Sequence, residues 1–216
     1  MWSDFIRELT ENYDIVLTAL LQHISISAVA IGLGILVAVP LGIFLVYHRK
    51  LAKVVLSILG VVNTLPSIVL LGLAMMFLGI GYVPAVAVLF LYSLLPIVRG
   101  TYTGICEVNP RYIKAAKGMG MNRMQMLRLV QLPLALPAII TGIRLSAVYI
   151  ISWATLASFI GGGGLGDPIW LGLQGYNFGL TLCGALPATA LALLVSALLN
   201  LLVKVFSKHR GGEVAA

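Results

Sequence analysis

Five apolar stretches dominate this chain, and each is close to the length that a helix needs to cross a lipid bilayer. They cover roughly residues 24–47, 54–78, 83–98, 133–160 and 180–206. Hydrocarbon offers no hydrogen-bond partner to a peptide group, so about 20 consecutive apolar residues cross it only as a helix. A mean hydropathy of +1.05 and a charged fraction of 10% exclude an ordinary soluble domain. We therefore predict an all-α polytopic membrane protein with about five transmembrane helices.

The charged residues lie in short segments between the apolar stretches and predict an orientation. The segment 1–17 has a net charge of −3, summed over Asp4, Arg7, Glu8, Glu11 and Asp14. Loops rich in Lys and Arg stay on the cytoplasmic side. We therefore expect an outside N-terminus with an amphipathic interfacial helix over 1–17, one membrane domain over 18–206, and a cytoplasmic tail over 207–216. The net charge of +7 then reflects topology and not nucleic-acid binding.

One polar interruption, Glu107 to Pro133, is much longer than the others. With its entrance it holds six basic residues against the single acid Glu107: Arg99, Arg111, Lys114, Lys117, Arg123 and Arg128. Asn109 can cap a helix that starts at Pro110, and Gly118 and Gly120 can supply a left-handed stop, which predicts a helix over 110–117. Asn122 can then cap a second helix that leads into the fourth apolar stretch.

This interruption resembles the cytoplasmic loop of bacterial ABC-importer permeases, whose pattern is Glu-Ala-Ala, three residues, Gly, nine residues, Ile-x-Leu-Pro. The spacing is kept in full, with Lys114 in place of Glu, Val130 in place of Ile, and matches at Ala115, Ala116, Gly120, Leu132 and Pro133. In that family the loop is a coupling helix that seats in a groove of a separate ATPase subunit. The resemblance implies a coupling loop over 105–132 that contacts the ATPase through the matching residues, Arg111 and Lys114. The alternative is a basic loop that lies on anionic headgroups, which needs the charge but not the spacing.

A second motif, Ser158 to Asp167, reads SFIGGGGLGD. It resembles the outer-loop signature of permeases that import quaternary-ammonium compatible solutes such as glycine betaine, carnitine and choline. A similar glycine-rich run occurs in methionine-importer permeases, so an amino-acid importer is the alternative. We expect an outer loop over 158–179, a short re-entrant helix over 168–173, and signature residues at Gly163, Gly164, Gly166 and Asp167.

The two motifs together imply the type I ABC importer permease fold in a bacterial cytoplasmic membrane. In that family two permease subunits, identical or paralogous, enclose the path. Two ATP-binding subunits attach inside, and a solute-binding protein docks outside. The resemblance places ATP and Mg on the ATPase partner and implies neither a cofactor, a metal nor a catalytic site on this chain.

Polar and aromatic residues inside the apolar stretches are the candidates for the translocation path. Pro66 breaks the second stretch and frees a carbonyl that Thr64, Ser67 or a neighbouring helix must satisfy, although a simple packing kink is the alternative. Arg144 either faces the path or snorkels back to brace the coupling loop. His23 is interpreted as an interfacial polar contact. The path candidates are Asn63, Thr64, Pro66, Ser67, Tyr92, Ser93, Arg144, Tyr149 and Trp153.

Other functional classes fit the sequence less well. Gly161, Gly163 and Gly166 formally spell the G-x-G-x-x-G dinucleotide fingerprint, but an apolar helix and not a strand precedes them. No Walker A sequence is present, so ATP hydrolysis is expected on another subunit. A stand-alone secondary transporter or channel would need inverted repeats and a carboxylate inside a span. A membrane enzyme would need a His-Glu, Ser-His or paired-carboxylate set, and the spans offer none.

Overall fold

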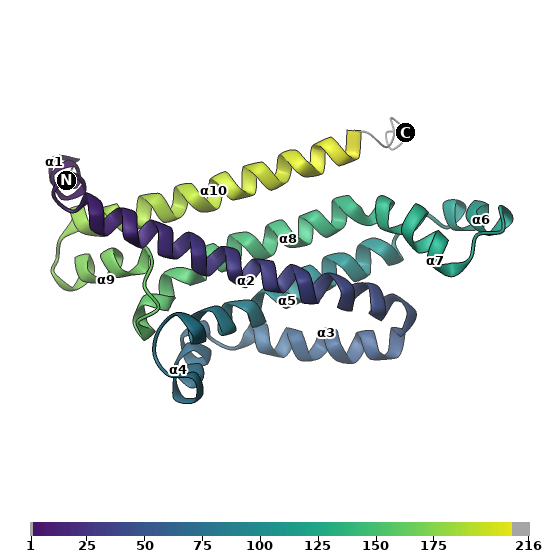
Figure 1. Cartoon of the computed structure of the whole chain (residues 1–216), viewed down its shortest axis with the longest axis horizontal. Coiled ribbons are helices and arrows are strands. Elements are labelled where there is room, and N and C mark those ends of the chain that lie inside the picture. Colours follow the sequence, from purple (N-terminus) through teal and green to yellow (C-terminus); the bar gives the residue numbers. More distant parts are fainter. Residues whose placement is uncertain (1, 209–216) are drawn as a thin grey trace.

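The computed structural model describes residues 2–208, and within that range the chain is helical apart from short connections (Figure 1). The helices are α1 (Trp2–Glu11), α2 (Tyr13–Tyr47), α3 (Arg49–Thr64), α4 (Ser67–Leu78), α5 (Tyr82–Cys106), α6 (Pro110–Gly118), α7 (Arg123–Met126), α8 (Leu132–Ala154), α9 (Gly166–Gln174) and α10 (Phe178–Lys208). A π-helical turn, Leu127–Gln131, joins α7 to α8, and a 3₁₀ segment, Thr155–Ile160, follows α8. The predicted all-α class is confirmed.

Three long helices, α2, α5 and α8, pack against one another along the long axis and form the centre of the bundle (Figure 1). α3 packs on α5 at one side of this centre, and α10 packs on α8 at the other. One end of the bundle carries α1 and α9, and we call it the α9 end. The opposite end carries α6 and α7, and we call it the α6–α7 end. The two candidate motifs therefore lie at opposite ends of the molecule.

Small residues bring the central helices into close contact. A Cβ atom added at Gly142 of α8 would lie 2.7 Å from the Pro96 carbonyl oxygen and 3.1 Å from the Gly100 Cα of α5. A Cβ added at Gly42 of α2 would lie 2.7 Å from the Thr101 Cβ, also of α5. Lipid tails are as apolar as side chains, so helices in a membrane associate through close packing of this kind and not through the hydrophobic effect. α5 is consequently the most enclosed of the membrane-length helices.

The second apolar stretch is broken, as Pro66 predicts. α3 and α4 meet at an angle of 96°, and both residues of the break, Leu65 and Pro66, have extended backbone angles, which a residue before proline prefers. α4 turns away from the bundle, and its Met76 and Phe77 are 76% and 85% exposed. Four of the described helices are long and apolar enough to cross a membrane, and the bent pair α3–α4 raises the number to five. The predicted count of about five is confirmed.

Two helices run further than the sequence analysis predicts. α2 begins at Tyr13 instead of residue 24, so it contains residues 13–17, which were expected to belong to an interfacial helix. α5 continues to Cys106 instead of residue 98. The reason is packing, because Thr101, Gly104 and Ile105 extend the buried face of α5 at helical spacing. Because the opposite face of α5 is buried, a single arginine, Arg99, does not end the helix.

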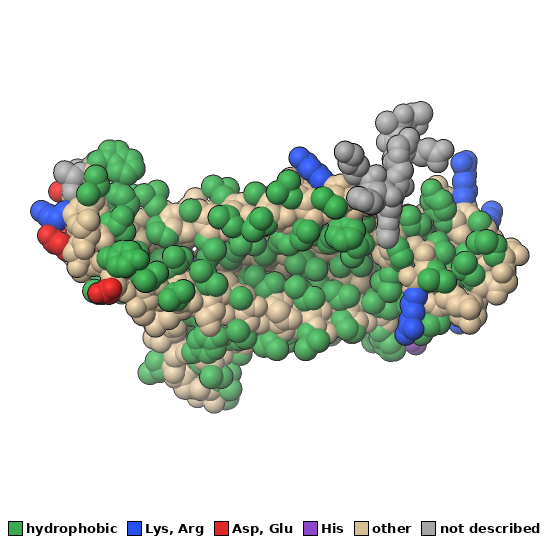
Figure 2. All heavy atoms as spheres, turned by 45° about the horizontal axis from the view of Figure 1, so that its top comes forward, with side chains coloured by type: hydrophobic (Ala, Val, Ile, Leu, Met, Phe, Trp, Pro, Cys, Tyr) green, Lys and Arg blue, Asp and Glu red, His purple; other side chains and the backbone are tan. Residues whose placement is uncertain are grey.

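Charge is divided between the two ends. In the view of Figure 2 the acidic side chains gather at the α9 end with one basic side chain beside them, most of the basic side chains lie toward the α6–α7 end, and the surface between the ends is largely apolar. Charged ends on either side of an apolar belt are the arrangement of a chain that crosses a bilayer along its long axis.

Candidate translocation cavity and coupling helices

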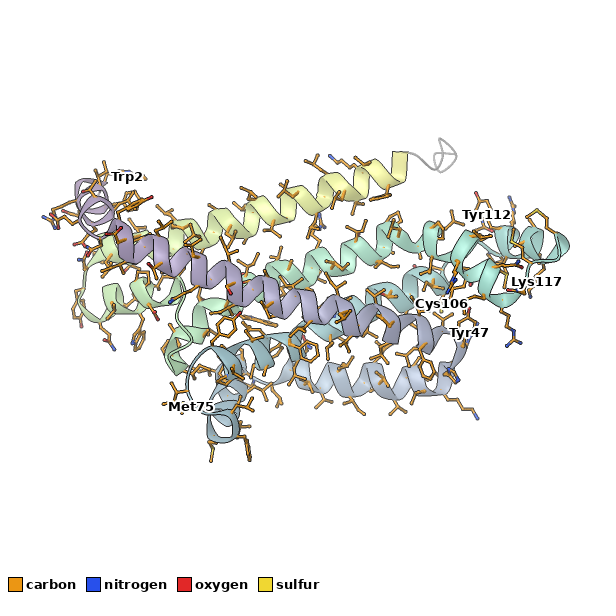
Figure 3. All side chains as sticks on the ribbon, viewed as in Figure 1. Trp2, Tyr47, Met75, Cys106, Tyr112 and Lys117 are labelled. Atoms are coloured by element: carbon orange, nitrogen blue, oxygen red, sulfur yellow. The ribbon has the colours of Figure 1, made fainter. Side chains whose placement is uncertain are left out.

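The tip of the α6–α7 end is formed by α6, and its start is fixed by the predicted cap. The Asn109 side chain accepts a hydrogen bond from the Arg111 N–H at 2.9 Å, and Pro110 occupies the first turn, where its missing N–H costs nothing. Only three residues, 107–109, separate α6 from α5. Figure 3 shows Tyr112 and Lys117 at this tip, far from the α9 end. α6 is thus a short, rigidly mounted projection.

The polar and basic face of α6 points away from the bundle. Arg111, Lys114, Ala115 and Lys117 are exposed, whereas Ala116 is completely buried. Ile113 packs on an apolar cluster beneath α6 that includes Ile105 and Leu127. The Ala-Ala pair of the motif therefore has two environments, one facing inward and one available to another molecule.

A left-handed turn connects α6 to the next helix. Gly120 has φ +79°, and a Cβ added there would meet no atom within 4 Å. Glycine is needed at this position for its backbone angle and not for space. Asn122 then caps α7 in a reciprocal capping box with Gln125, with both hydrogen bonds at 2.9 Å. The predicted left-handed stop and second cap are both present.

Residues Arg123 to Ile160 form one continuous helical rod of 38 residues. The rod begins as α7, widens into the π-turn, and continues as α8, with Leu132 and Pro133 in the first turn of α8. Pro133 lies inside this rod and removes one backbone hydrogen bond, and the π-turn directly before it is the kind of local widening that accommodates such a loss. The rod connects the α6–α7 end directly to the α9 end.

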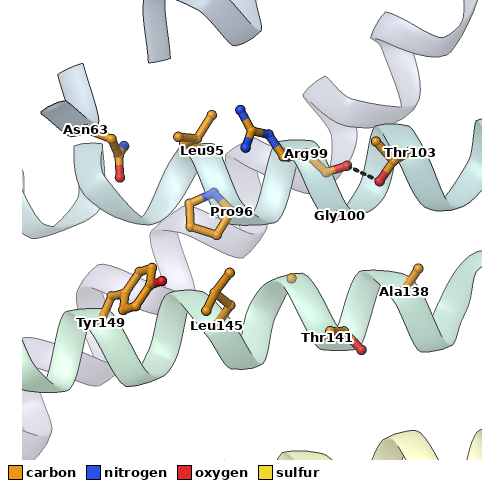
Figure 4. Close-up of a pocket in the computed structure, with 11 residues that line it drawn as sticks. Asn63, Leu95, Pro96, Arg99, Gly100, Thr103, Ala138, Thr141, Leu145 and Tyr149 are labelled. Atoms are coloured by element: carbon orange, nitrogen blue, oxygen red, sulfur yellow. Dashed lines mark hydrogen bonds between the residues drawn. The ribbon is translucent and has the colours of Figure 1, made fainter. Parts of the chain in front are cut away.

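A cavity with a volume of about 580 Å³ lies between α5 and α8 (Figure 4). It contains two of the predicted path residues, Asn63 from α3 and Tyr149 from α8. Its polar lining is completed by Arg99, Thr103 and Thr141. The apolar lining consists of Leu95, Pro96, Gly100, Ala138, Gly142 and Leu145. A cavity of this size and composition is suited to a small organic solute.

Arg99 is the functional candidate that the sequence analysis placed wrongly. It lies seven residues before the end of α5 (106 − 99) and lines the cavity instead of the loop entrance. A basic side chain that lines a cavity between two apolar helices is a functional candidate in its own right. The sequence contains a signal for this placement. Small or apolar residues continue at helical spacing past the charge, at Thr101, Gly104, Ile105 and Val108.

Three aromatic rings connect the break in the second stretch to the cavity. The Tyr92 hydroxyl donates to the Leu65 carbonyl oxygen at 2.7 Å, which satisfies a carbonyl at the break. The Tyr92 ring lies 4.6 Å from Trp153, and Trp153 stacks on Tyr149 at 5.5 Å between centroids. Tyr92 itself is only 1% exposed. The neighbouring helix, and not Thr64 or Ser67, supplies the partner that the break requires.

Replacing Tyr92 by Phe is expected to lower the free energy of unfolding by about 1 kcal/mol, because it removes the part-buried hydrogen bond to the Leu65 carbonyl while keeping the ring packing. Denaturant unfolding of the purified protein in detergent measures this change. Tyr149→Phe is the matched control, since that side chain is 42% exposed and loss of its hydroxyl should cost no more than about 0.5 kcal/mol. Equal losses in the two variants would contradict the assigned hydrogen bond.

The remaining path candidates lie outside the cavity. Ser93 is fully buried and donates to the Phe90 carbonyl oxygen at 2.6 Å. Thr64 donates to the Val61 carbonyl oxygen at 2.7 Å, and Pro66 and Ser67 begin α4. Arg144 neither lines this cavity nor braces the coupling loop. Its guanidinium donates to the Asn200 amide oxygen of α10 at 3.2 Å, so it joins α8 to α10 within the apolar belt.

At the α9 end the glycine-rich motif forms a tight turn followed by α9, which corresponds to the predicted re-entrant helix but starts at Gly166. Gly163 and Gly164 have φ +76° and +96°. Gly166 packs on the Thr155 carbonyl oxygen so closely that a side chain would not fit. Asp167 lines a small cavity with Asp14 and Gln22, and burial raises the pKa of its carboxyl group above the usual value.

The interpretation of His23 as an interfacial contact is wrong. Its side chain is completely buried between α2, α8 and the glycine-rich turn. The sequence offers no signal for this, because a polar residue near the end of an apolar stretch is equally common at an interface. Both cysteines are free, with Cys106 exposed and Cys183 buried. Within residues 2–208 no group of three His, Cys, Asp or Glu side chains could hold a metal ion.

Comparison with known proteins relates this geometry to a family. The family model "Binding-protein-dependent transport system inner membrane component" matches residues 30–211. The choline transport system permease protein OpuBB of Bacillus subtilis (strain 168) is 51% identical over 174 residues, which are 81% of this chain and 80% of that protein. The glycine betaine/carnitine/choline transport system permease protein OpuCB of the same organism is 50% identical over 174 residues, with the same coverage of both chains.

Among solved structures, an inward-facing conformation of the MetNI methionine ABC transporter contains a similar chain. The TM-score is 0.77 at 21% sequence identity, and the match covers 89% of this chain and 96% of that chain. At such an identity the similarity concerns the fold alone. It relates the bundle of α2, α5 and α8, with α6 projecting from one end, to the fold of ABC importer permeases.

Proposed function

The chain belongs to the family of binding-protein-dependent transport system inner membrane components, and from this we propose that it is the membrane-spanning subunit of an ATP-driven ABC importer for a quaternary-ammonium compatible solute. The observation that carries the proposal is the 50–51% identity, over 174 residues, to permeases named for choline, glycine betaine and carnitine transport. The type I importer fold and the multi-pass helical architecture are in agreement with it.

The partners follow from this role. Two ATP-binding subunits would seat on α6 at the cytoplasmic side and hold the ATP and Mg, and a solute-binding protein would dock at the α9 end. A second permease subunit would close the cavity between α5 and α8, which a single chain does not fully enclose. The positively charged α6–α7 end supports a cytoplasmic location, and the acidic α9 end an external one, in a bacterial cytoplasmic membrane.

The mechanism derives from the connection between α6 and the cavity. α6 is joined to α5 by three residues, and its other end leads through the Gly120 turn into the continuous rod 123–160. Closure of the ATPase pair would draw the two copies of α6 together and rock α5 and α8 as rigid bodies. The cavity between them would then open alternately to either side. The Ala116 and Ile113 contacts let α6 transmit this motion without sliding on the bundle.

The cavity lining fits a quaternary-ammonium group better than an ion that needs a counter-charge. Within the described residues its lining contains no carboxylate and one cation, Arg99, and Tyr149 with Trp153 behind it offers aromatic faces. Arg99 can pair with a carboxylate, so the lining suits a zwitterion such as glycine betaine better than a bare cation. Aromatic faces attract quaternary ammonium groups through the negative potential above the ring. Selection of the individual solute would be shared with the binding protein.

Uptake into proteoliposomes that contain the permease, its ATPase and its binding protein tests the proposal. We expect ATP-dependent uptake of at least one of radiolabelled glycine betaine, carnitine and choline, and none of methionine. Uptake of methionine alone would support an amino-acid importer. Uptake by the permease without the ATPase would support a stand-alone transporter. Either result would overturn the proposed function.

A further inference from the structure

Two adjacent side chains near the start of α2 hold the glycine-rich turn against the bundle. The Gln22 amide oxygen accepts a hydrogen bond from the Gly164 N–H at 3.1 Å. His23 Nδ1 lies 3.3 Å from the Leu165 nitrogen, and His23 Nε2 lies 3.0 Å from the Ile151 carbonyl oxygen of α8. These residues are 142 and 128 positions apart in the sequence. One short piece of α2 thus joins both the turn and α8.

The backbone partners fix the protonation state of His23. A carbonyl oxygen only accepts, so Nε2 must carry the proton that it donates to Ile151. A backbone N–H only donates, so Nδ1 must be unprotonated to accept from Leu165. His23 is therefore neutral, with both ring nitrogens used, and it is 0% exposed. Among uncharged side chains only another group with one donor and one acceptor could replace it.

The turn can make this close contact because its residues facing α2 are glycines. Gly163 has a left-handed backbone angle, and a Cβ added there would overlap the Gln22 amide oxygen. A Cβ added at Gly164 would lie 3.2 Å from His23 Nδ1. The turn therefore needs glycine at both positions to approach α2, and Gln22 and His23 are the side chains that it approaches.

The contact extends to the other elements of the α9 end. α9 begins at Gly166, the residue after Leu165, so it is mounted directly on the turn. Two residues further along α2, the Ser25 hydroxyl lies 3.0 Å from the Tyr82 hydroxyl at the start of α5. The Gly81 N–H donates to the Ile160 carbonyl oxygen at 2.8 Å, which ties α5 to the end of the rod. Hydrogen bonds between different elements are thus concentrated at this end.

We propose that Gln22 and His23 are positioning residues for transport, which fasten the turn 163–165, and with it α9, to α2 and α8. The contact, which we call the α2 latch, makes α9 move with the two helices instead of independently of them. This inference rests on the proposed function, because in it a binding protein docks at the α9 end and the latch transmits this docking to the transmembrane helices. Without the latch, docking would still move the end of the rod, on which Gly166 packs, but α2 would no longer follow.

The complete complex, reconstituted in lipid nanodiscs with its ATPase, its binding protein and glycine betaine as the probe, tests the latch with two measurements. The first is hydrogen exchange of the segment 161–167. The second is the ratio of ATPase activity with the glycine-betaine-loaded binding protein to the activity without it. In His23→Phe, which keeps a ring but no polar atom, we expect about tenfold faster exchange and a ratio that falls to near 1, the value without stimulation.

Three further variants make the result specific. His23→Gln retains one donor and one acceptor and should preserve most of the stimulation. Gln22→Met removes the acceptor for Gly164 at an exposed position, so it tests the latch even if His23→Phe fails to assemble. His48→Phe makes the same chemical change at the other end of α2, where the imidazole is exposed and contacts Phe44. This control should match the wild type in both measurements.

The outcomes separate the latch from the proposed function. Faster exchange with an unchanged stimulation ratio would show a merely structural contact and overturn the positioning role. Unchanged exchange in both His23→Phe and Gln22→Met would overturn the latch itself. If no loaded binding protein stimulates the wild-type complex, the proposed function fails, and the exchange measurement still decides whether the latch exists.

Discussion

Replacing Gly120 by Val should reduce ATP-dependent solute uptake about tenfold, since the left-handed turn between α6 and α7 costs a residue with a Cβ about 1–2 kcal/mol. A β-branched residue is especially disfavoured at φ +79°, the angle that Gly120 adopts. The added side chain meets no other atom. The substitution therefore changes only the backbone preference, and α6 would be presented to the ATPase at a different angle. Uptake in proteoliposomes, normalised to assembled complex, measures the effect.

Gly118→Val is the matched control for this prediction. Gly118 lies two residues earlier in the same exposed tip, has no left-handed backbone angle, and has open space around it. We expect its uptake to stay within about twofold of the wild type, because Val is no worse than Gly in a helix. If both variants lose uptake equally, side-chain bulk at the tip and not the turn is responsible. If neither loses it, the coupling role of this turn is wrong.

Replacing Gly142 by Leu should prevent the close contact of α5 and α8. Its Cβ would lie 2.7 Å from the Pro96 carbonyl oxygen and 3.1 Å from the Gly100 Cα, and neither backbone can move without shifting a whole helix. Overpacking of this kind costs about 1–3 kcal/mol and occasionally more. For a chain of this size each kcal/mol lowers the midpoint of thermal unfolding by about 2–4 °C. The midpoint in detergent should therefore fall by roughly 2–12 °C.

Gly72→Leu is the matched control for Gly142→Leu. Gly72 also lies within an apolar helix, but a Cβ added there meets no atom within 4 Å. Its effect on stability should remain within about 0.5 kcal/mol. A thermal midpoint for Gly142→Leu that equals this control would mean that α5 and α8 do not cross at these glycines.

The parts of the fold that local chemistry determines could be predicted from the sequence. Asn109, Pro110, Gly120 and Asn122 place the ends of α6 and α7 because each residue satisfies a backbone requirement of its immediate neighbours. The apolar lengths predict the spans, since a membrane sets that length independently of the fold. Pro66 predicts the break in the second stretch because proline has no N–H to continue the helix.

Features that depend on a distant partner could not be predicted in this way. The Leu65 carbonyl at the break is bonded by Tyr92, 27 positions away, and the partner of Arg144 is Asn200, 56 positions away. Arg99 was assigned to a loop because a charge was assumed to end a span, whereas packing of the opposite face keeps α5 helical. His23 looks like any polar residue near a membrane surface until the turn 163–165 is placed against it. Tertiary contacts decide each of these cases.

The π-helical turn Leu127–Gln131 has a consequence for the direction in which the tip faces. Each residue of an α-helix rotates the chain by about 100°, so the one extra residue that a π-turn accommodates resets the azimuth of everything beyond it. The direction in which α7 and the attached α6 face is therefore set independently of the face that α8 turns toward the cavity. Permeases of this family could change the contacts of the α6–α7 end by gaining or losing one residue here, with the cavity wall left unaltered.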